Sequence, residues 1–202
     1  MGFTNQKGVK ATIPFGMNQV PAMWLSAGSR GGKTTLISNV LLSMFRNSDG
    51  TLQVTAFDAK HGAEFLDCIR PFTKIVDVPS DVKKAKNQAE KLKREILERA
   101  AYKNSVNAKT MNEAWLKGLA GSEKYQPHVV VFDEWPVISN LKGSKEDEEA
   151  SEAILELCRK LLGMGSALGY VVFILSQTGR MESMKALGGM VDNISVRIYG
   201  FQ

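Results

Sequence analysis

Short runs of apolar residues alternate along this chain with longer segments in which apolar residues recur at helical spacing. The runs have the length of strands and are bounded by Gly, Pro, Asn or Asp. We predict β-strands at Met23–Ala27, Gln53–Asp58, Lys74–Pro79, His128–Glu134, Tyr170–Leu175 and Ile194–Phe201. Because several of these strands are apolar at consecutive positions, they are typical of a parallel sheet that is covered on both faces.

The longer segments predict the helices that cover this sheet. Thr34–Phe45 and Glu148–Met164 both carry apolar residues at helical spacing. Ser80-Asp81 has the residue types of a helix cap, and the helix that it opens keeps one apolar face as far as Ala100. Its other faces carry the basic residues Lys83, Lys84, Lys86, Lys91, Lys93, Arg94 and Arg99. Strands that alternate with helices predict an α/β fold with a mostly parallel sheet and helices on both faces.

The length of 202 residues is enough for one sizeable core, so we predict a single domain, 1–202. The segment Lys10–Phe15 alternates loosely and predicts an edge strand that leads to the first strand of the sheet. The stretch 104–126 is polar and interrupted by glycines, with an apolar trio around Trp115. We expect a short helix there, within a mobile insertion.

The octapeptide Ala27-Gly28-Ser29-Arg30-Gly31-Gly32-Lys33-Thr34 lies between the first predicted strand and the first predicted helix. This is the setting of a phosphate-binding loop, the Walker A motif, although Ala27 stands where the motif usually has Gly. The glycines let the backbone turn its N–H groups onto an anion, Lys33 adds a positive charge, and Thr34 offers a hydroxyl group to Mg²⁺. We expect the nucleotide to contact Gly28, Ser29, Arg30, Gly31, Gly32, Lys33, Thr34 and Thr35.

Polar residues lie at the carboxyl ends of two predicted strands, 128–134 and 170–175. Asp133 and Glu134 end one apolar run, as in a Walker B motif, and Gln177 follows the next. Because ligands bind beyond the carboxyl ends of parallel strands, these side chains should meet the phosphate loop. We expect Asp133 to hold Mg²⁺ with Thr34, Glu134 to orient and deprotonate the attacking water, and Gln177 to sense the γ-phosphate of ATP. With Lys33, Glu134 and Gln177 as catalytic residues, the pattern predicts ATP hydrolysis.

The spacing of the two motifs narrows the class of enzyme. About 100 residues separate Lys33 from Glu134, which suits a sheet with an extra strand between the two motifs. Small GTPases and nucleotide kinases generally lack a catalytic Glu at this place, whereas ATPases of the additional-strand type have it. The sequence therefore favours an ATPase over those two classes.

Net charge and hydropathy narrow the function less than the motifs do. The net charge of +5 and the pI near 9.2 favour a polyanionic partner only slightly. Lys83–Lys109 holds nine Lys or Arg against three Glu, whereas Glu146–Glu156 is acidic. The basic stretch is either a solvated helix face or a surface for nucleic acid, and the sequence leaves both open. No apolar run approaches the roughly 20 residues that span a bilayer, and the N-terminus lacks a signal peptide's apolar core, so we expect no membrane segment. The isolated Cys68 and Cys158 match no metal or redox spacing and indicate reduced thiols in a cytoplasmic protein, although a disulfide between them stays open.

Several segments, in this order, resemble the FtsK/HerA superfamily of DNA-pumping ATPases. The likeness runs from about Thr12 to Phe201. It includes the strand and phosphate loop (24–34) and a segment like the family's Asp-Pro-Lys (57–60). It also includes the strand that ends in Asp-Glu (129–134), a strand like the family's strand that ends in Thr-Gln (169–177), and a terminal strand with an Arg (192–198).

The resemblance implies a RecA-like P-loop NTPase core, assembly into a hexameric ring and ATP-driven movement of double-stranded DNA through its pore. The basic segment Lys83–Lys109 would then contact DNA or a neighbouring subunit, through phosphate electrostatics and without base reading. Plasmid conjugation, chromosome segregation and virus genome packaging all remain open as the biological setting.

The chain departs from the family at three positions. Ala59 replaces the Pro, Ser176 replaces the Thr, and Ser166 stands where members commonly carry an Arg that reaches into the adjacent subunit's site. The remaining candidates for that role are Arg159, Arg180 and Arg197. Two other functions stay open: a P-loop ATPase that acts on protein or another non-DNA substrate, and a nucleotide-gated assembly scaffold in which hydrolysis is incidental.

Overall fold

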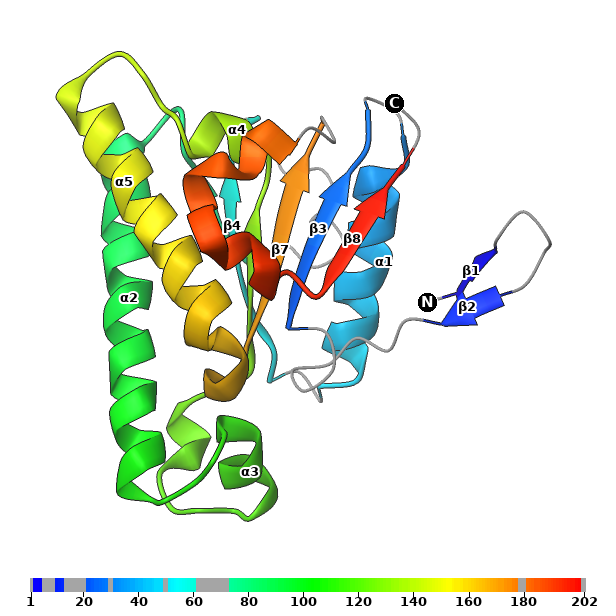
Figure 1. Cartoon of the computed structure of the whole chain (residues 1–202). Coiled ribbons are helices and arrows are strands. Elements are labelled where there is room, and N and C mark those ends of the chain that lie inside the picture. Colours follow the sequence, from blue (N-terminus) through cyan, green and yellow to red (C-terminus); the bar gives the residue numbers. More distant parts are fainter. Residues whose placement is uncertain are drawn as a thin grey trace.

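The computed structural model describes residues 2–4, 10–12, 21–28, 31–48, 51–60, 73–177 and 181–200. Its centre is a six-stranded sheet in the order β5-β4-β6-β7-β3-β8, in which all neighbouring strands are parallel (Figure 1). The strands are β3 (Ala22–Ser26), β4 (Gln53–Asp58), β5 (Thr73–Asp77), β6 (His128–Phe132), β7 (Tyr170–Ser176) and β8 (Val196–Tyr199). The parallel sheet predicted from the apolar runs is confirmed.

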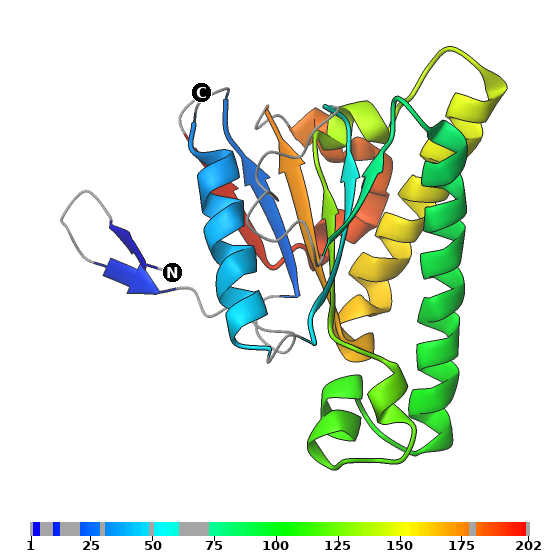
Figure 2. The ribbon, with the colours of Figure 1, turned by 180° about the vertical axis from the view of Figure 1, so that it is seen from behind.

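Helices cover both faces of the sheet, as Figures 1 and 2 show from opposite sides. One face carries α1 (Lys33–Arg46), and the other carries α2 (Val82–Ser105) and α5 (Lys145–Lys160) side by side. Because successive side chains of a strand point to opposite faces, Met23 lies in the core under α1 and Trp24 in the core under α2 and α5. Every residue of β6 and β7 is buried, so the central strands contribute to both cores.

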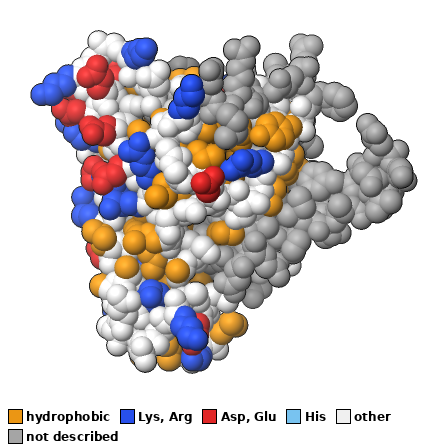
Figure 3. Space-filling model, in the orientation of Figure 1, with side chains coloured by type: hydrophobic (Ala, Val, Ile, Leu, Met, Phe, Trp, Pro, Cys, Tyr) orange, Lys and Arg blue, Asp and Glu red, His pale blue; other side chains and the backbone are white. Residues whose placement is uncertain are grey.

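Ion pairs join α2 to α5. As predicted, α2 begins at a cap, where the Asp81 side chain accepts a hydrogen bond of 2.8 Å from the backbone N–H of Lys84. The ion pairs between the two helices are Lys86–Glu149 and Lys93–Glu156. Figure 3 shows basic and acidic side chains intermingled over this side of the molecule. Part of the basic stretch is therefore neutralised by the acidic stretch of the same chain.

The prediction that Arg99 lies on an exposed face of α2 is wrong. Its side chain is 1% exposed and pairs with Glu95 at 2.6 Å. The guanidinium also donates to the carbonyl oxygens of Leu168 and Gln126, and it lies 4.4 Å from the centre of the Tyr170 ring. These partners replace the water that the charge would otherwise bind, so the charge is tolerated in the interior.

His128 extends this buried polar cluster at the amino end of β6. Its Nε2 lies 3.0 Å from Thr55 Oγ1, and its ring stacks on Tyr170. Burial lowers the pKa of His128, which favours the neutral ring. Burial alone would raise the pKa of Glu95, but the nearby His128 ring, whose Nδ1 lies 3.8 Å away, and the charge of Arg99 outweigh it and lower that pKa to about 2.

The edge strand predicted at Lys10–Phe15 is not part of the central sheet. Instead, β2 (Lys10–Thr12) pairs with β1 (Gly2–Thr4) as a separate antiparallel pair. Residues 13–15 lie outside the described residues. Alternation alone did not specify a partner, because two short strands close in sequence can pair with each other.

Shorter helical elements complete the described part of the chain, among them the single turns η2 (Ser122–Lys124), η3 (Leu161–Gly165) and η4 (Ser166–Leu168). The short helix expected within 104–126 is α3 (Met111–Leu116). Two others had no prediction: α4 (Trp135–Ile138) and η5 (Met181–Asn193), the latter a run of 3₁₀ turns broken at Gly188. None of the helices that the structure describes is long and apolar enough to cross a membrane.

Candidate nucleotide site

The carboxyl ends of all six parallel strands lie at one edge of the sheet, and the candidate site residues follow β3, β4, β6 and β7. Between β3 and β6 lies β7, so the strand before the phosphate loop and the strand before Asp133 are separated by one other strand. Ser26 is in register with Ser176, and the N–H of Ala27 donates to the Ser176 carbonyl oxygen at 3.1 Å. The extra strand expected between the two motifs is therefore confirmed, and Gln177 directly follows the strand end that pairs with the start of the phosphate loop.

The phosphate loop leads directly into α1. Gly32 caps this helix with a φ of 77°, a left-handed conformation that glycine adopts without strain. Lys33, Thr34 and Thr35 form the first turn of α1, where free backbone N–H groups and the helix dipole favour an anion. Ser29 and Arg30, also expected to contact nucleotide, lie outside the described residues.

Gly200 supports the phosphate loop from behind. Its N–H donates to the Ser26 carbonyl oxygen at 2.7 Å, which ties the end of β8 to the end of β3. A Cβ atom at position 200 would lie 2.8 Å from the Ala27 Cβ and 3.3 Å from the Gly31 carbonyl oxygen. The place that usually holds Gly in the motif is thus filled by the methyl group of Ala27, and the space for it is left by Gly200.

Glu134 lies in a turn that directs it toward the phosphate loop. Its φ of 54° is left-handed, which is uncommon for a residue with a side chain. It caps the short helix α4, which is anchored by Trp135, buried and edge-on to Phe132 at 5.6 Å. Such strain persists only where the surrounding packing fixes the turn, and it is found most often at functional sites.

Two lysines converge on the Glu134 carboxylate. Lys33 Nζ and Lys60 Nζ each lie 2.7 Å from the same oxygen, Oε1. The Lys60 side chain is 43% exposed, whereas those of Lys33 and Glu134 are 10% and 7% exposed. Lys60 follows Asp58, whose Oδ1 accepts the Lys60 N–H at 2.9 Å. Three strand ends therefore contribute to one charged cluster.

The pKa values of the neighbouring carboxyl groups of Glu134 and Asp133 are shifted in opposite directions. Burial alone would raise the pKa of Glu134, but hydrogen bonds from Lys33 and Lys60 hold it below its usual value. The pKa of Asp133 is raised to about 6, because burial and the charges of Glu134 and Asp58 outweigh the opposing charges of Lys60 and Lys33. Glu134 is thus the stabilised anion, and Asp133 is a carboxyl group whose ionisation calls for a further cation.

The residues fit a Mg²⁺ ion bound together with nucleotide phosphates. Asp133 is buried, and among the described residues no hydrogen bond engages its carboxyl group, so its oxygens are available to a metal. No group of three or more His, Cys, Asp or Glu gathers as a metal site in the part of the chain that the structure describes. Mg²⁺ is usually held by one or two carboxylates plus phosphates and water, so a single buried carboxyl group such as that of Asp133 suits it.

The remaining predicted residues are less closely tied to the cluster. The Gln177 side chain is exposed, and no hydrogen bond engages it within the described ranges. Arg159 donates to the Ala186 carbonyl oxygen, and Arg197 donates to that of Val191 at 2.9 Å. Neither arginine meets the Lys33–Glu134 cluster of its own chain. Arg180 lies outside the described residues.

The sequence did not assign Lys60 a role. The signal was the polar segment Asp58-Ala59-Lys60 at the carboxyl end of an apolar strand. Its position in the sheet could not be read from the sequence, because the strand order decides which ends are adjacent. Since β4 is the direct neighbour of β6, Lys60 reaches Glu134.

No protein-family model matches this chain, and no curated protein matches it in sequence. Solved structures do. The conjugation coupling protein TcpA of pCW3, in a monomer form with ATPγS, matches with a TM-score of 0.77 at 20% identity, over 98% of this chain and 52% of that chain. The cytoplasmic domain of EssC matches with a TM-score of 0.75 at 16% identity, over 99% and 36%. ATPases 2 and 3 of Thermomonospora curvata EccC, in complex with a signal sequence peptide, match with a TM-score of 0.64 at 12% identity, over 96% of this chain and 33% of that chain.

These neighbours are FtsK/HerA-type ATPases, and this chain spans about half or less of the length of each. The chain has their α/β fold, that of a RecA-like P-loop ATPase. The fold expected from the sequence resemblance is confirmed.

Proposed function

We propose that this chain is the ATP-hydrolysing motor domain of a double-stranded DNA translocase of the FtsK/HerA type. The observation that carries the proposal is the convergence of Lys33 and Lys60 on Glu134 at the carboxyl edge of the sheet. A phosphate loop, a buried carboxylate for a metal and a second carboxylate for water are the parts that ATP hydrolysis needs. The match to TcpA, whose structure contains ATPγS, supports nucleotide binding.

In this proposal each residue of the site has one role. The N-terminus of α1 and the loop N–H groups bind the phosphates, and Lys33 neutralises charge on them. Thr34 and Asp133 hold Mg²⁺, which supplies Lewis-acid stabilisation of the phosphate charge. Glu134 orients the attacking water and accepts its proton, and Gln177 contacts the γ-phosphate. Residues Gly28 to Thr35 surround the phosphates.

The motor is proposed to act as a ring, a hexamer, on duplex DNA in the cytoplasm. A ring supplies what the described site lacks within its own chain, an arginine at the nucleotide, from Arg159, Arg180 or Arg197 of a neighbour. The 104–126 insertion, which contains α3 and flanking turns, is proposed to be a mobile part of each motor domain. The resemblance of TcpA, a conjugation coupling protein, favours DNA as the cargo.

The test of the site is the variant Glu134→Gln, which keeps the shape and removes the base. We expect it to bind ATP and to hydrolyse it about a hundredfold or more slowly than the wild type. Glu123→Gln is the matched control, because Glu123 is exposed on the far insertion. Turnover of Glu134→Gln equal to that of the control would remove Glu134 from the mechanism.

The test of the cargo is ATP turnover with and without linear duplex DNA, at low and moderate salt, beside a mass measurement of the assembly. A DNA motor turns over faster with DNA, and salt weakens the effect because phosphate contacts release counterions. Turnover that is indifferent to DNA at every salt concentration would overturn DNA translocation and leave the ATPase.

A second function has one observation in its favour. EccC is named a type VII secretion ATPase, and one of its structures contains a signal sequence peptide, so this fold also serves proteins that handle polypeptides. An ATPase that acts on protein would be stimulated by an extended peptide and not by duplex DNA. A scaffold that only binds nucleotide would keep its assembled mass in Glu134→Gln and show no turnover in the wild type.

A further inference from the structure

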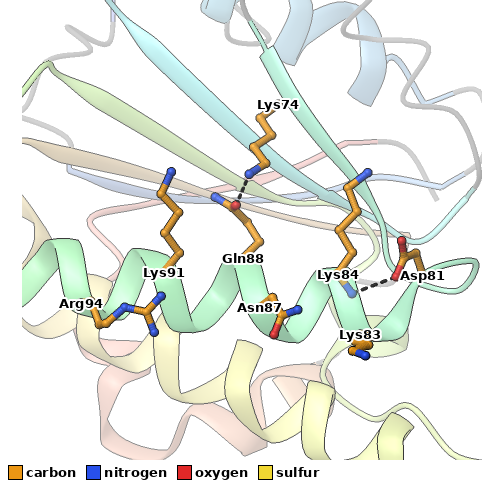
Figure 4. A pocket seen from close by; sticks show the side chains of 8 residues that line it. All are labelled: Lys74, Asp81, Lys83, Lys84, Asn87, Gln88, Lys91 and Arg94. Atoms are coloured by element: carbon orange, nitrogen blue, oxygen red, sulfur yellow. Dashed lines mark hydrogen bonds between the residues drawn. The ribbon is translucent and has the colours of Figure 1, made fainter.

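Helix α2 has two basic faces, and only one of them is neutralised. Lys86 and Lys93 point toward α5 and pair with Glu149 and Glu156. The other face turns toward β5, the edge strand of the sheet, where a hollow of about 470 Å³ opens between the helix and the strand (Figure 4). The cations that line it include Lys74 of β5 and Lys84, Lys91 and Arg94 of α2.

These cations have no carboxylate partner in the described part of the chain. The one carboxylate among the lining residues is Asp81, and it is engaged as the helix cap with the backbone N–H of Lys84. Within the described residues, the Lys74 ammonium donates to the side-chain oxygen of Gln88. Burial lowers the pKa of Lys74, and the charges of Lys91 and Lys84 lower it further. The cations therefore repel one another, and an anion in the hollow would relieve that repulsion.

The other lining groups indicate which anion fits. Asn87 and Gln88 add side-chain amides between the cations, and no aromatic side chain is among the lining residues. Lys, Arg, Asn and Gln are the side chains that donate to phosphate oxygens, whereas binding of single strands relies on aromatic stacking. The lining is therefore suited to a phosphate backbone and offers no platform for bases.

Lys84 and Lys91 are spaced along α2, and Lys74 faces them from β5 (Figure 4). A smaller hollow of about 180 Å³ shares Lys74, Gln88 and Lys91 with the first one. It is also lined by His128 and by Glu95, whose carboxylate is paired with Arg99. Lys84 and Lys91 are two helical turns apart, about 10 Å along the axis of α2. Over that length one strand of a duplex presents about three phosphates. Since β5 is the edge of the sheet, these cations lie at one side of the molecule.

We infer that the groove between α2 and β5, formed by Lys74, Lys84, Lys91 and Arg94, is a binding site for the phosphate backbone of duplex DNA. The site is separate from the nucleotide site, which lies at the ends of β3, β4 and β6. The inference rests on the proposed function in taking duplex DNA as the polyanion. It divides the basic segment Lys83–Lys109 into a part that binds α5 and a part that binds phosphate.

The experiment compares a groove variant with a variant of equal charge. Lys84→Glu/Lys91→Glu reverses two groove cations and places carboxylates near Lys74, so the fold gains ion pairs there. Lys124→Glu/Lys142→Glu makes the same change of net charge at exposed positions outside the groove. The measurements are binding to a short fluorescent duplex as a function of salt, and ATP turnover with and without DNA.

We expect the groove variant to bind duplex about tenfold or more weakly than the charge control and its salt slope to fall by about two. Duplexes of different sequence should lose affinity alike, because phosphate contacts carry no sequence information. Turnover without DNA should stay at the wild-type value, since neither lysine belongs to the nucleotide site.

Three outcomes overturn the inference. If DNA stimulates both variants equally, the motor stands and DNA binds elsewhere. If wild-type protein binds no duplex, the proposed cargo and the groove site both fail. If poly-glutamate binds in a manner that depends on Lys84 and Lys91 and duplex does not, the groove takes an acidic protein segment instead.

Discussion

At the scale of single residues, the phosphate loop depends on a glycine far from it in sequence. Gly200 leaves the space that the Ala27 methyl group fills, and its N–H holds the carbonyl oxygen of Ser26. A motif search centred on the loop has no means of finding Gly200. Its role follows from the parallel pairing of β3 with β8, which brings residues 26 and 199 into register.

Gly200→Ala should therefore weaken both the fold and nucleotide binding. The added methyl group meets a neighbouring Cβ and a backbone oxygen, and neither is the end of a flexible side chain. We expect a loss of roughly 1–3 kcal/mol in the free energy of unfolding, as for other overpacked sites, and a lower affinity for ATP. Thermal unfolding and nucleotide titration measure the two effects.

Gly189→Ala is the control for this prediction. A Cβ atom at position 189 would have nothing within 4 Å, so that variant should keep the wild-type unfolding temperature and ATP affinity. Equal behaviour of the two variants would mean that Gly200 does not support the loop.

At the scale of elements, the strands of the central sheet were predictable, whereas α4 and η5 were not. Apolar runs such as Val129–Phe132 have one stable arrangement in a chain of this size, buried between two layers of helices. By contrast, α4 has only four residues and depends on the left-handed turn at Glu134, which tertiary contacts impose. Likewise, the basic residues of α2 gave no sign that Arg99 would be covered by Leu168, Gln126 and Tyr170, so its burial was not predicted.

The polar cluster between α2 and the amino end of β6 should make stability depend on pH. The folded-state pKa of Glu95 lies below its ordinary value of 4.5, so the stability that it contributes is present above that pH and is lost as the pH falls toward 2. The pKa of His128 is lowered from 6.5, so the unfolded chain takes up a proton first and stability also declines below that pH.

We expect the free energy of unfolding to fall on acidification from pH 7, and to fall further below pH 4.5. Glu95→Gln should be less stable than wild type at pH 7, because it leaves the Arg99 charge without its partner, and the difference should shrink toward pH 2. Denaturant titrations at a series of pH values provide the measurement. Parallel curves for the two proteins would show that Glu95 does not carry this dependence.

At the scale of the whole molecule, the fold places all the predicted site residues that the structure describes at one edge of the sheet. The sequence predicted that edge because the carboxyl ends of parallel strands share it. The sequence could not predict an arginine from a neighbouring chain, since that depends on how copies assemble. Within the described residues, Lys33 and Lys60 already engage Glu134, and Arg159 and Arg197 remain exposed and outside the cluster.

The proposed ring should therefore be more active than its separate subunits. We expect turnover per chain to rise with protein concentration over the range in which the measured mass rises. A mixture of Lys33→Ala chains, which lack a working site, with Arg197→Ala chains should recover turnover if Arg197 acts on a neighbour. The same mixture made with Arg159→Ala tests the other described candidate. Constant turnover per chain through the change in mass would argue against an arginine shared between subunits.

The pairing of both lysines with a single oxygen of Glu134 has a consequence for how ATP enters. Lys33 is already paired with the Glu134 carboxylate before the nucleotide binds, so the phosphates of ATP must replace that carboxylate as its partner. Lys60 can stay behind, because it holds the same oxygen from another strand. Nucleotide binding at this site is then an exchange of one anion for another at Lys33, and the same displacement that seats the phosphate releases Glu134 from Lys33 while Lys60 still holds it.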